Sequence, residues 1–238
     1  MAHNGDGGAT RSGVALVYRL WRRVARVSDS DETNRATRGA LILCGGGSRR
    51  MGRDKASLPF GTETMLARVI RIVGEAVPRE QIVVAAGADQ ALPPLPWAAM
   101  VVRDRDADRG PLPALVDGLK SLPTNVSAVF VTACDAPLLE LAFVEALFAA
   151  LEPRIDAAVP SDGERLYPLT AVYRPSCVAA LQAALEEGDS SLQRALRSST
   201  FRLKSLPLEQ LRSVDAELRS LVNCNTPEEY QAALGLFR

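Results

Sequence analysis

Histidine is almost missing from this sequence of 238 residues, in which His3 is the only one. It stands in a polar stretch near the N-terminus that is expected to lack a fixed structure. A Ser-His-Asp triad, a Cys-His pair and a zinc site with histidine ligands are therefore excluded. Carboxylates, amides, lysines, arginines and backbone groups must carry whatever chemistry the chain performs.

Cysteine pairs, long apolar runs and a net charge are missing as well. The cysteines show no C-x-x-C pair and no zinc-ligand spacing, so free thiols in a reducing, cytoplasmic compartment are expected. They are Cys44, Cys134, Cys177 and Cys224. No apolar run reaches the roughly 18 residues that span a bilayer. Basic and acidic residues number 28 each, so no general attraction to nucleic acid or to an anionic membrane is expected.

The N-terminal part differs in composition from the rest. Residues 1–38 are mostly polar and are predicted to be a disordered or weakly structured tail, whereas residues 39–238 are predicted to form one domain. Within the tail, Val14–Val27 has the pattern of a basic amphipathic helix. That segment either docks on a membrane surface or a partner, or is a loosely attached extension.

From Gly39 onwards, short apolar runs alternate with stretches of helical periodicity. The apolar runs predict strands at Ala40–Cys44, Gln81–Ala86, Ala98–Arg103, Ser127–Ala133, Ile155–Val159, Leu166–Tyr173, Phe201–Leu206 and Arg219–Val222. Helices are predicted at Thr64–Val77, Leu112–Leu122, Leu139–Leu151, Pro175–Glu187, Ser190–Arg197 and Thr226–Leu236. This alternation predicts an α/β fold of three layers, with a mostly parallel sheet covered by helices on both faces.

A glycine-rich segment follows the first predicted strand. Gly45-Gly46-Gly47 lets backbone N–H groups crowd around an anion, and Arg49, Arg50, Arg53 and Lys55 add positive charge. Arg53-Asp54 breaks the Walker A pattern, and Arg50 stands where a dinucleotide fingerprint needs its third glycine. The segment is therefore predicted to bind a triphosphate in another way.

Asp135 stands just past the predicted strand Ser127–Ala133, where open parallel sheets place ligand-binding groups. Ala136 and Pro137 follow it and stiffen the loop. Two interpretations remain open. Asp135 is either a magnesium ligand, since Mg²⁺ prefers oxygen donors, or the N-cap of the helix at Leu139–Leu151.

These motifs resemble those of the molybdenum cofactor guanylyltransferases. Leu43–Lys55 resembles their signature L-[AC]-G-G-x-[SA]-x-R-M-G-x-D-K. Four further segments resemble family motifs in the same order: Asp104 with Gly110–Leu112, Thr132–Pro137, Tyr167–Tyr173 and Asn223–Glu229. The resemblance runs from Gly39 to about Leu236 and implies the nucleotide-diphospho-sugar transferase fold, which is Rossmann-like.

The resemblance also implies roles for particular residues. Arg49 and Lys55 would act in catalysis. Asp135 and Asn225 would hold Mg²⁺, although Asn225 could instead cap the helix that follows it. The nucleotide would be bound by Leu43, Cys44, Gly45, Lys55, Asp104 and Asp135, although Asp104 could equally belong to a solvated run of charges. GTP would be the donor and molybdenum-molybdopterin the acceptor, and contacts with other molybdenum cofactor proteins are conceivable.

Three functional hypotheses follow. The first is transfer of GMP to the acceptor's phosphate, which is already ionised near neutral pH, so that no histidine base is needed. Ala85 departs from the family, because the guanylyltransferase pattern has an asparagine there that touches the nucleotide. A CTP-dependent cytidylyltransferase acting on molybdopterin or another small phosphate monoester is therefore the second. The third is a non-catalytic adaptor of molybdenum metabolism.

Overall fold

The computed structural model describes residues 34–45, 54–104 and 110–237. Residues 36–238 form one compact unit. The amphipathic pattern at Val14–Val27 and most of the predicted tail lie outside the described residues. In the parts that are described, no helix has the length and apolarity needed to cross a membrane.

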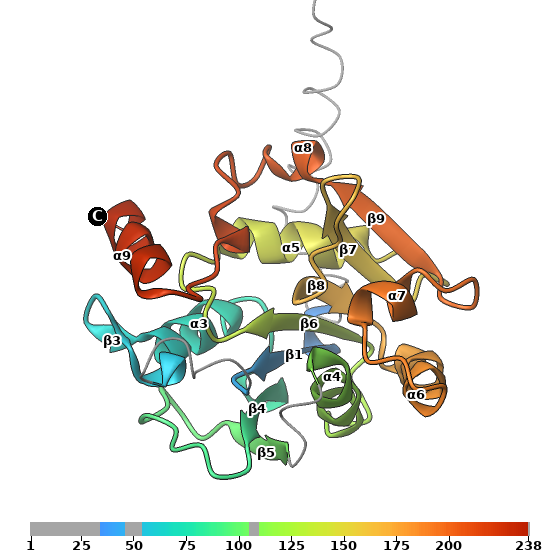
Figure 1. Cartoon of the computed structure of the whole chain (residues 1–238), viewed down its shortest axis with the longest axis horizontal. Helices are drawn as coiled ribbons and strands as arrows, with labels where there is room; N and C mark the ends of the chain where they lie inside the picture. The colour runs from blue at the N-terminus through green and yellow to red at the C-terminus, as the bar shows by residue number, and fades with distance from the viewer. Residues whose placement is uncertain (1–33, 46–53, 105–109, 238) are drawn as a thin grey trace, which may run out of the picture. The chain divides into compact units, whose positions relative to one another are not determined.

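A seven-stranded sheet forms the centre, with strand order β5-β4-β1-β6-β8-β7-β9 (Figure 1). Its strands are β1 (Arg38–Leu43), β4 (Ile82–Gly87), β5 (Met100–Asp104), β6 (Ala128–Ala133), β7 (Ala157–Ser161), β8 (Thr170–Tyr173) and β9 (Leu203–Pro207). The first four neighbours, β5-β4-β1-β6, are all parallel. Strand β8 runs antiparallel to both β6 and β7, and β9 is parallel to β7. The predicted, mostly parallel sheet is confirmed.

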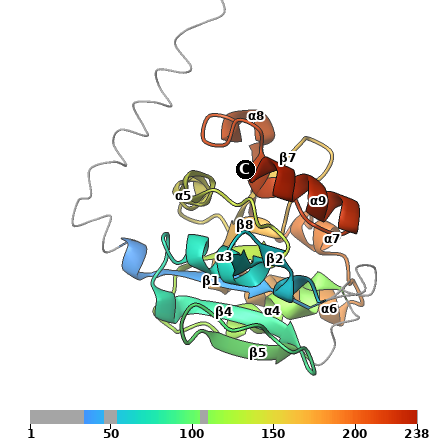
Figure 2. The same ribbon diagram turned by 90° about the vertical axis from the view of Figure 1, so that its left-hand side faces the viewer.

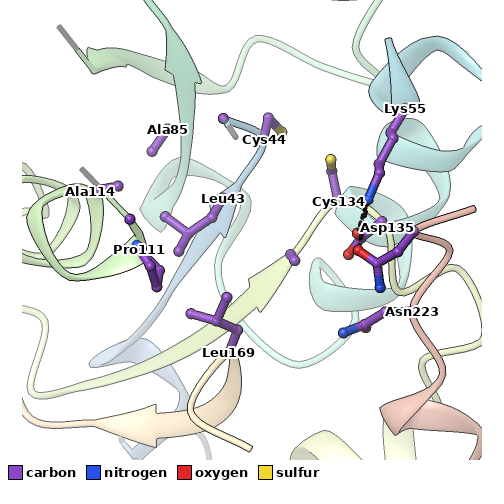
Figure 3. Close-up of a pocket in the computed structure, with 14 residues that line it drawn as sticks. Leu43, Cys44, Lys55, Ala85, Pro111, Ala114, Cys134, Asp135, Leu169 and Asn223 are labelled. Carbon is purple, nitrogen blue, oxygen red and sulfur yellow. Dashed lines mark hydrogen bonds and ion pairs between the residues drawn. The ribbon is translucent and has the colours of Figure 1, made fainter. Parts of the chain in front are cut away.

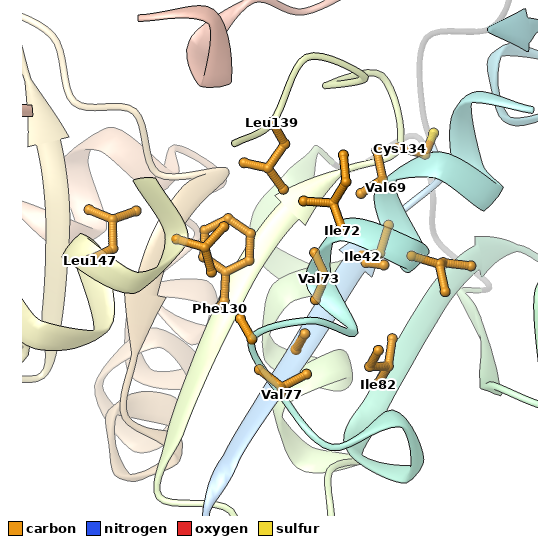
Figure 4. Packing of buried hydrophobic residues seen from close by; sticks show 14 of the residues in the cluster. Ile42, Val69, Ile72, Val73, Val77, Ile82, Phe130, Cys134, Leu139 and Leu147 are labelled. Carbon is orange, nitrogen blue, oxygen red and sulfur yellow. The ribbon is translucent and has the colours of Figure 1, made fainter. Parts of the chain in front are cut away.

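Helices cover both faces of this sheet, so the predicted three layers are also confirmed. On one face, Ala40 and Ile42 of β1 pack in a core with α3 (Met65–Val73) and α5 (Leu141–Ala150) (Figure 4). Leu41 and Leu43 point to the other face. There the core is completed by α4 (Pro111–Lys120), α6 (Val178–Glu186) and α7 (Leu192–Leu196). After Arg38, strand β1 has no polar side chain, as expected for a strand that is buried on both faces.

Helix α4 packs closely against β1. A Cβ atom placed on Gly118 would come within 2.4 Å of Leu41 Cδ2, so a side chain at this position would force the buried Leu41 to shift. Gly110, which precedes α4, has φ 87°, a conformation that residues with a side chain rarely adopt. Gly118 thus lets the last turn of α4 pack directly on β1, and Gly110 leads into the start of the helix, which lines the pocket described below.

A smaller cluster joins the hairpin of β2 (Pro59–Phe60) and β3 (Glu63–Thr64) to α9 (Pro227–Leu236) (Figures 1 and 2). The predicted start of α9 is confirmed. Thr226 Oγ1 accepts from the Glu229 N–H at 3.2 Å, and the Glu229 carboxylate accepts from the Thr226 N–H at 3.1 Å. This reciprocal capping box fixes where the helix begins.

The strand predicted at Arg219–Val222 is wrong, because a 3₁₀ turn occupies Arg219–Leu221. The Asp215 carboxylate accepts from the N–H groups of Arg219 at 2.9 Å and Ser220 at 2.8 Å. A carboxylate that holds two successive N–H groups draws the chain into a turn and removes these donors from any strand ladder. The remaining short elements are 3₁₀ turns at Lys55–Ser57 (η2), Arg79–Gln81 (η3) and Pro175–Cys177 (η5), and helix α8 at Leu208–Leu211.

Candidate active site

The candidate site is a pocket of about 270 Å³ at the carboxyl ends of the central strands (Figure 3). The chain runs from β1 outwards to β4 and β5, then returns to β6 on the other side of β1. The order of strands therefore reverses between β1 and β6, where open α/β sheets bind their ligands. Lining residues are Leu43, Cys44, Gly45, Lys55, Ala85, Gly110, Pro111, Ala114, Ala133, Cys134, Asp135, Leu169, Asn223 and Asn225.

Lys55 stands at one end of the pocket, and its side chain is held between two oxygens. Its Nζ donates to Asp135 Oδ2 at 2.8 Å and to Asn225 Oδ1 at 2.9 Å. Lys55 is only 6% exposed, so the ion pair is largely shielded from water. Asp54 fixes the turn that carries Lys55 by accepting from the Ala56 N–H at 3.0 Å.

Asp135 lies in the tight loop after β6, and neighbouring segments hold that loop. Its backbone carbonyl accepts from the Cys224 N–H at 2.8 Å, and Arg68 Nε donates to the Pro137 carbonyl at 2.6 Å. The N-cap of α5 is Glu140, so Asp135 does not cap that helix. Its carboxylate has one oxygen on Lys55. The other, Oδ1, is buried and has no hydrogen-bond partner among the described residues.

Asn225 directly precedes the capping box of α9. Its N–H donates to the Glu229 carboxylate at 2.6 Å, whereas its side-chain oxygen accepts from Lys55. The side chain thus faces the pocket, and Thr226 is the residue that caps α9. Because the Cys224 N–H bonds the Asp135 carbonyl, the backbone itself sets Asn225 beside Asp135.

The opposite end of the pocket is apolar. Leu43, Ala85, Pro111 and Ala114 lie there, away from Lys55 and Asp135 (Figure 3). The backbone N–H of Cys44 donates to the Ala85 carbonyl at 2.7 Å, which joins the ends of β1 and β4. The pocket therefore offers apolar surface at one end and charged groups at the other.

Two cysteines beside the pocket, Cys134 and Cys224, are not poised to act as nucleophiles. A hydrogen bond with Cys44, together with burial, raises the pKa of the Cys134 thiol well above its ordinary value. Burial, with the nearby Asp135 charge, raises the pKa of Cys224 to about 12. Both thiols therefore stay protonated at neutral pH and serve as packing groups.

Comparison with known proteins identifies the family of this chain. The sequence profile of the MobA-like NTP transferase domain matches residues 40–205. The molybdenum cofactor guanylyltransferase of Desulfosudis oleivorans is 32% identical over 194 residues, which cover 81% of this chain and 92% of the relative. The chain belongs to the MobA-like NTP transferase family. It is thus a member of a family of nucleotidyltransferases.

Solved structures share the fold of this MobA-like NTP transferase. Molybdopterin-guanine dinucleotide biosynthesis protein A from Archaeoglobus fulgidus has a TM-score of 0.66 at 23% identity, over 83% of this chain and 97% of that one. Rv0371C from Mycobacterium tuberculosis, solved as a complex with manganese, has a TM-score of 0.57 at 15% identity, over 84% of this chain and 98% of that one.

The predicted site residues of this MobA-like NTP transferase fall into two groups. Six of them line the single pocket described above: Leu43, Cys44, Gly45, Lys55, Asp135 and Asn225. Arg49 lies outside the described residues. Asp104 is the last residue of β5, where it pairs with Gly87, and its side chain is not described.

The sequence motifs assigned no role to Asn223, although it is part of the motif that supplied Asn225. In this MobA-like NTP transferase Asn223 lines the main pocket and also a neighbouring one of about 330 Å³. Pro111 and Leu169 are likewise shared, so the two pockets adjoin. Arg165, Tyr167 and Gln193 are among the residues of the second pocket.

Proposed function

We propose that this protein transfers GMP from GTP to the phosphate of molybdenum-molybdopterin, forming the guanine dinucleotide cofactor and pyrophosphate. The observation that carries the proposal is the buried pair of Lys55 and Asp135, with Asn225 as second acceptor for the lysine, at the switch point of the sheet. Its substrates are taken from the relative named as a molybdenum cofactor guanylyltransferase at 32% identity.

The two ends of the pocket suit the two ends of a nucleotide. The base and ribose would lie over Leu43, Ala85 and Pro111, with Asp104 as a further contact. The triphosphate would extend past the backbone of Cys44 and Gly45 towards Lys55. Arg49 would add charge to the same end. In this orientation the α-phosphate comes to the ammonium group, which stabilises negative charge as it develops there.

The reaction itself needs no base from the protein. An oxygen of the acceptor phosphate attacks the α-phosphorus, and the bond from that phosphorus to the oxygen bridging the β-phosphate breaks. The electron pair leaves with pyrophosphate. A phosphate monoester has a second pKa of about 6 and is ionised at neutral pH. Catalysis therefore reduces to positioning and charge neutralisation, which Lys55 supplies without a histidine.

The residues present fit a divalent cation, and we infer that it is Mg²⁺. Asp135 Oδ1 is buried and unpaired among the described residues, and a carboxylate oxygen is the donor that Mg²⁺ prefers. Within the described ranges no group of three or more His, Cys, Asp or Glu side chains could hold a metal by itself. Asp135, with Asn225 as second ligand, would hold it jointly with the nucleotide. When bound, the ion neutralises charge on the phosphates.

The second pocket is a suitable place for the acceptor. It adjoins the nucleotide pocket through Asn223 and Leu169, so an acceptor phosphate could reach the donor from there. Arg165 lies in this pocket with its guanidinium 5.5 Å from the ring centroid of Tyr167. A flat heterocycle could stack on the tyrosine ring, and a phosphate could pair with the guanidinium.

We also infer a cytoplasmic location. It agrees with the four cysteines, which are all buried as free thiols.

A panel of nucleotides tests the proposal. Purified protein, Mg²⁺ and molybdenum-molybdopterin are incubated with GTP, CTP, ATP or UTP, and pyrophosphate release is measured. Release with GTP at least about tenfold faster than with the others is expected, since a tenfold ratio corresponds to about 1.4 kcal/mol of discrimination. Preference for CTP would show that the protein is a cytidylyltransferase instead. This outcome is worth testing because the side chain of Ala85 cannot form a hydrogen bond with a base. Binding of GTP without any turnover would favour an adaptor.

A further inference from the structure

A glutamine next to the pocket, Gln90, forms hydrogen bonds with three separate segments of the chain. Gln90 follows β4 in a tight turn, where its N–H donates to the Gly87 carbonyl at 3.2 Å. Its side-chain Oε1 accepts from the Gly87 N–H at 3.0 Å. Arg103 Nη1 donates to the carbonyls of Gln90 at 2.6 Å and Gly87 at 3.1 Å. The amide group of Gln90 is thus held rigidly at the carboxyl end of β4.

The amide nitrogen of Gln90 reaches two other segments. Its Nε2 donates to the Cys44 carbonyl at 3.2 Å and to both carboxylate oxygens of Asp54 at 3.0 Å each. Cys44 directly follows β1, and Asp54 directly precedes Lys55. One side chain therefore joins the two ends of the glycine-rich segment and anchors both to β4.

The turn η2, which carries Lys55, begins next to this junction. Asp54 caps the turn η2 through the Ala56 N–H, and Lys55 is the first residue of that turn. Bringing the ends of a loop together costs conformational entropy. Gln90 fixes Cys44 and Asp54 in the folded protein, so the pocket residues Cys44, Gly45 and Lys55 need not be ordered when a triphosphate binds.

We propose that Gln90 is a positioning residue that sets the affinity for the nucleoside triphosphate by clamping Cys44 to Asp54. The proposal rests on the function given above, because it takes the pocket beside Cys44, Gly45 and Lys55 as the triphosphate site. Gln90 acts through Asp54 and the backbone and takes no part in the bond-making step. Asp135 and Asn225 still hold the Lys55 ammonium when Gln90 is removed, so its removal should raise Kd and KM for GTP while leaving kcat nearly unchanged.

The first test measures GTP binding by isothermal titration calorimetry with Mg²⁺ present. Q90A loses hydrogen bonds to a charged group, and about a tenfold rise in Kd for GTP is expected. In steady-state assays KM should rise similarly, with kcat within about twofold of the wild type. The matched control is Q182A, which removes an amide from α6 that contacts Lys120 and Glu186 at the surface. Its Kd for GTP should not change.

A second pair of variants separates clamping from a general loss of packing. Q90E sets a carboxylate against that of Asp54, and like charges at this distance should weaken GTP binding more than Q90A does. In Q90E/D54N the amide and the carboxylate exchange places, so the contact between positions 90 and 54 can form again, whereas the Cys44 carbonyl stays without its donor. The amide introduced by D54N also keeps an oxygen for the Ala56 N–H. The double variant should therefore bind GTP more tightly than Q90E and less tightly than the wild type.

The outcomes distinguish the two proposals. If the wild type binds no GTP, the proposed function fails. If the wild type binds GTP and Q90A binds it equally well, the role of Gln90 is overturned. That role is also overturned if Q90E/D54N binds GTP no better than Q90E does. Should Q90A melt below the assay temperature, the comparison of Q90E with Q90E/D54N decides alone.

Discussion

Replacing Lys55 by methionine should lower the stability of the folded protein as well as its activity. The Lys55 and Asp135 side chains are only 8% and 12% exposed, and their charged atoms are 2.8 Å apart. K55M keeps most of the apolar stem but leaves the carboxylate buried without its counter-ion, and Asn225 Oδ1 loses its donor. Breaking one partner of a buried pair costs about 3–5 kcal/mol. For a domain of this size, each kcal/mol lowers Tm by about 2–4 °C, so a fall of about 6–20 °C is expected.

Thermal unfolding followed by circular dichroism, in chelator and without nucleotide, measures this directly. The double variant K55M/D135N removes the unpaired charge and should melt above K55M, which isolates the coupling between the two side chains. Lys120 provides the control, because it donates to Gln182 on the surface. K120M should change stability by no more than about 0.5 kcal/mol. A K55M protein that melts within about 2 °C of the wild type, on a scale of about 2–4 °C per kcal/mol, would refute the reasoning.

Three further predictions concern chemistry, packing and thiols. D135A should lower turnover by at least about 10²-fold in the pyrophosphate assay, the scale of one lost electrostatic contact, and near-normal turnover would contradict its role. G118A should cost about 1–3 kcal/mol in thermal unfolding, because its Cβ would meet a β1 side chain at 2.4 Å, whereas G235A, with open space around it, should cost nothing. Burial raises the pKa of both Cys177 and Cys224 to about 12, so a disulfide reagent at about pH 8 should label them only after denaturation; rapid labelling of the folded protein would count against the burial described.

Local patterns were sufficient for much of the fold. The apolar run of β1, closed by glycines, and the Thr226–Glu229 capping box each depend on neighbours in the sequence, and both are confirmed. The strand predicted at Arg219–Val222 failed because a carboxylate nearby in sequence, Asp215, competes for the backbone N–H groups. Apolar residues alone do not reveal such a competitor.

The motifs also predicted which residues meet, but not which atoms do. Lys55 contacts Asp135 and Asn225, which lie 80 and 170 positions further along the chain. Their meeting follows from the reversal of strand order between β1 and β6, and no spacing in the sequence encodes that reversal. Gln90 was missed because its position carries no chemical signature. Its importance comes only from the three segments that the fold brings around its amide.

The ion pair also explains how the site keeps its shape without a nucleotide. A buried carboxylate is costly unless a positive charge compensates it. In this structure Lys55 provides that compensation, and Asn225 completes the set of acceptors for the ammonium group. Asp135 Oδ1 is left without a partner among the described residues. The lysine therefore aligns the carboxylate with one oxygen engaged and one without a described donor, which is the arrangement that the proposed cation site requires.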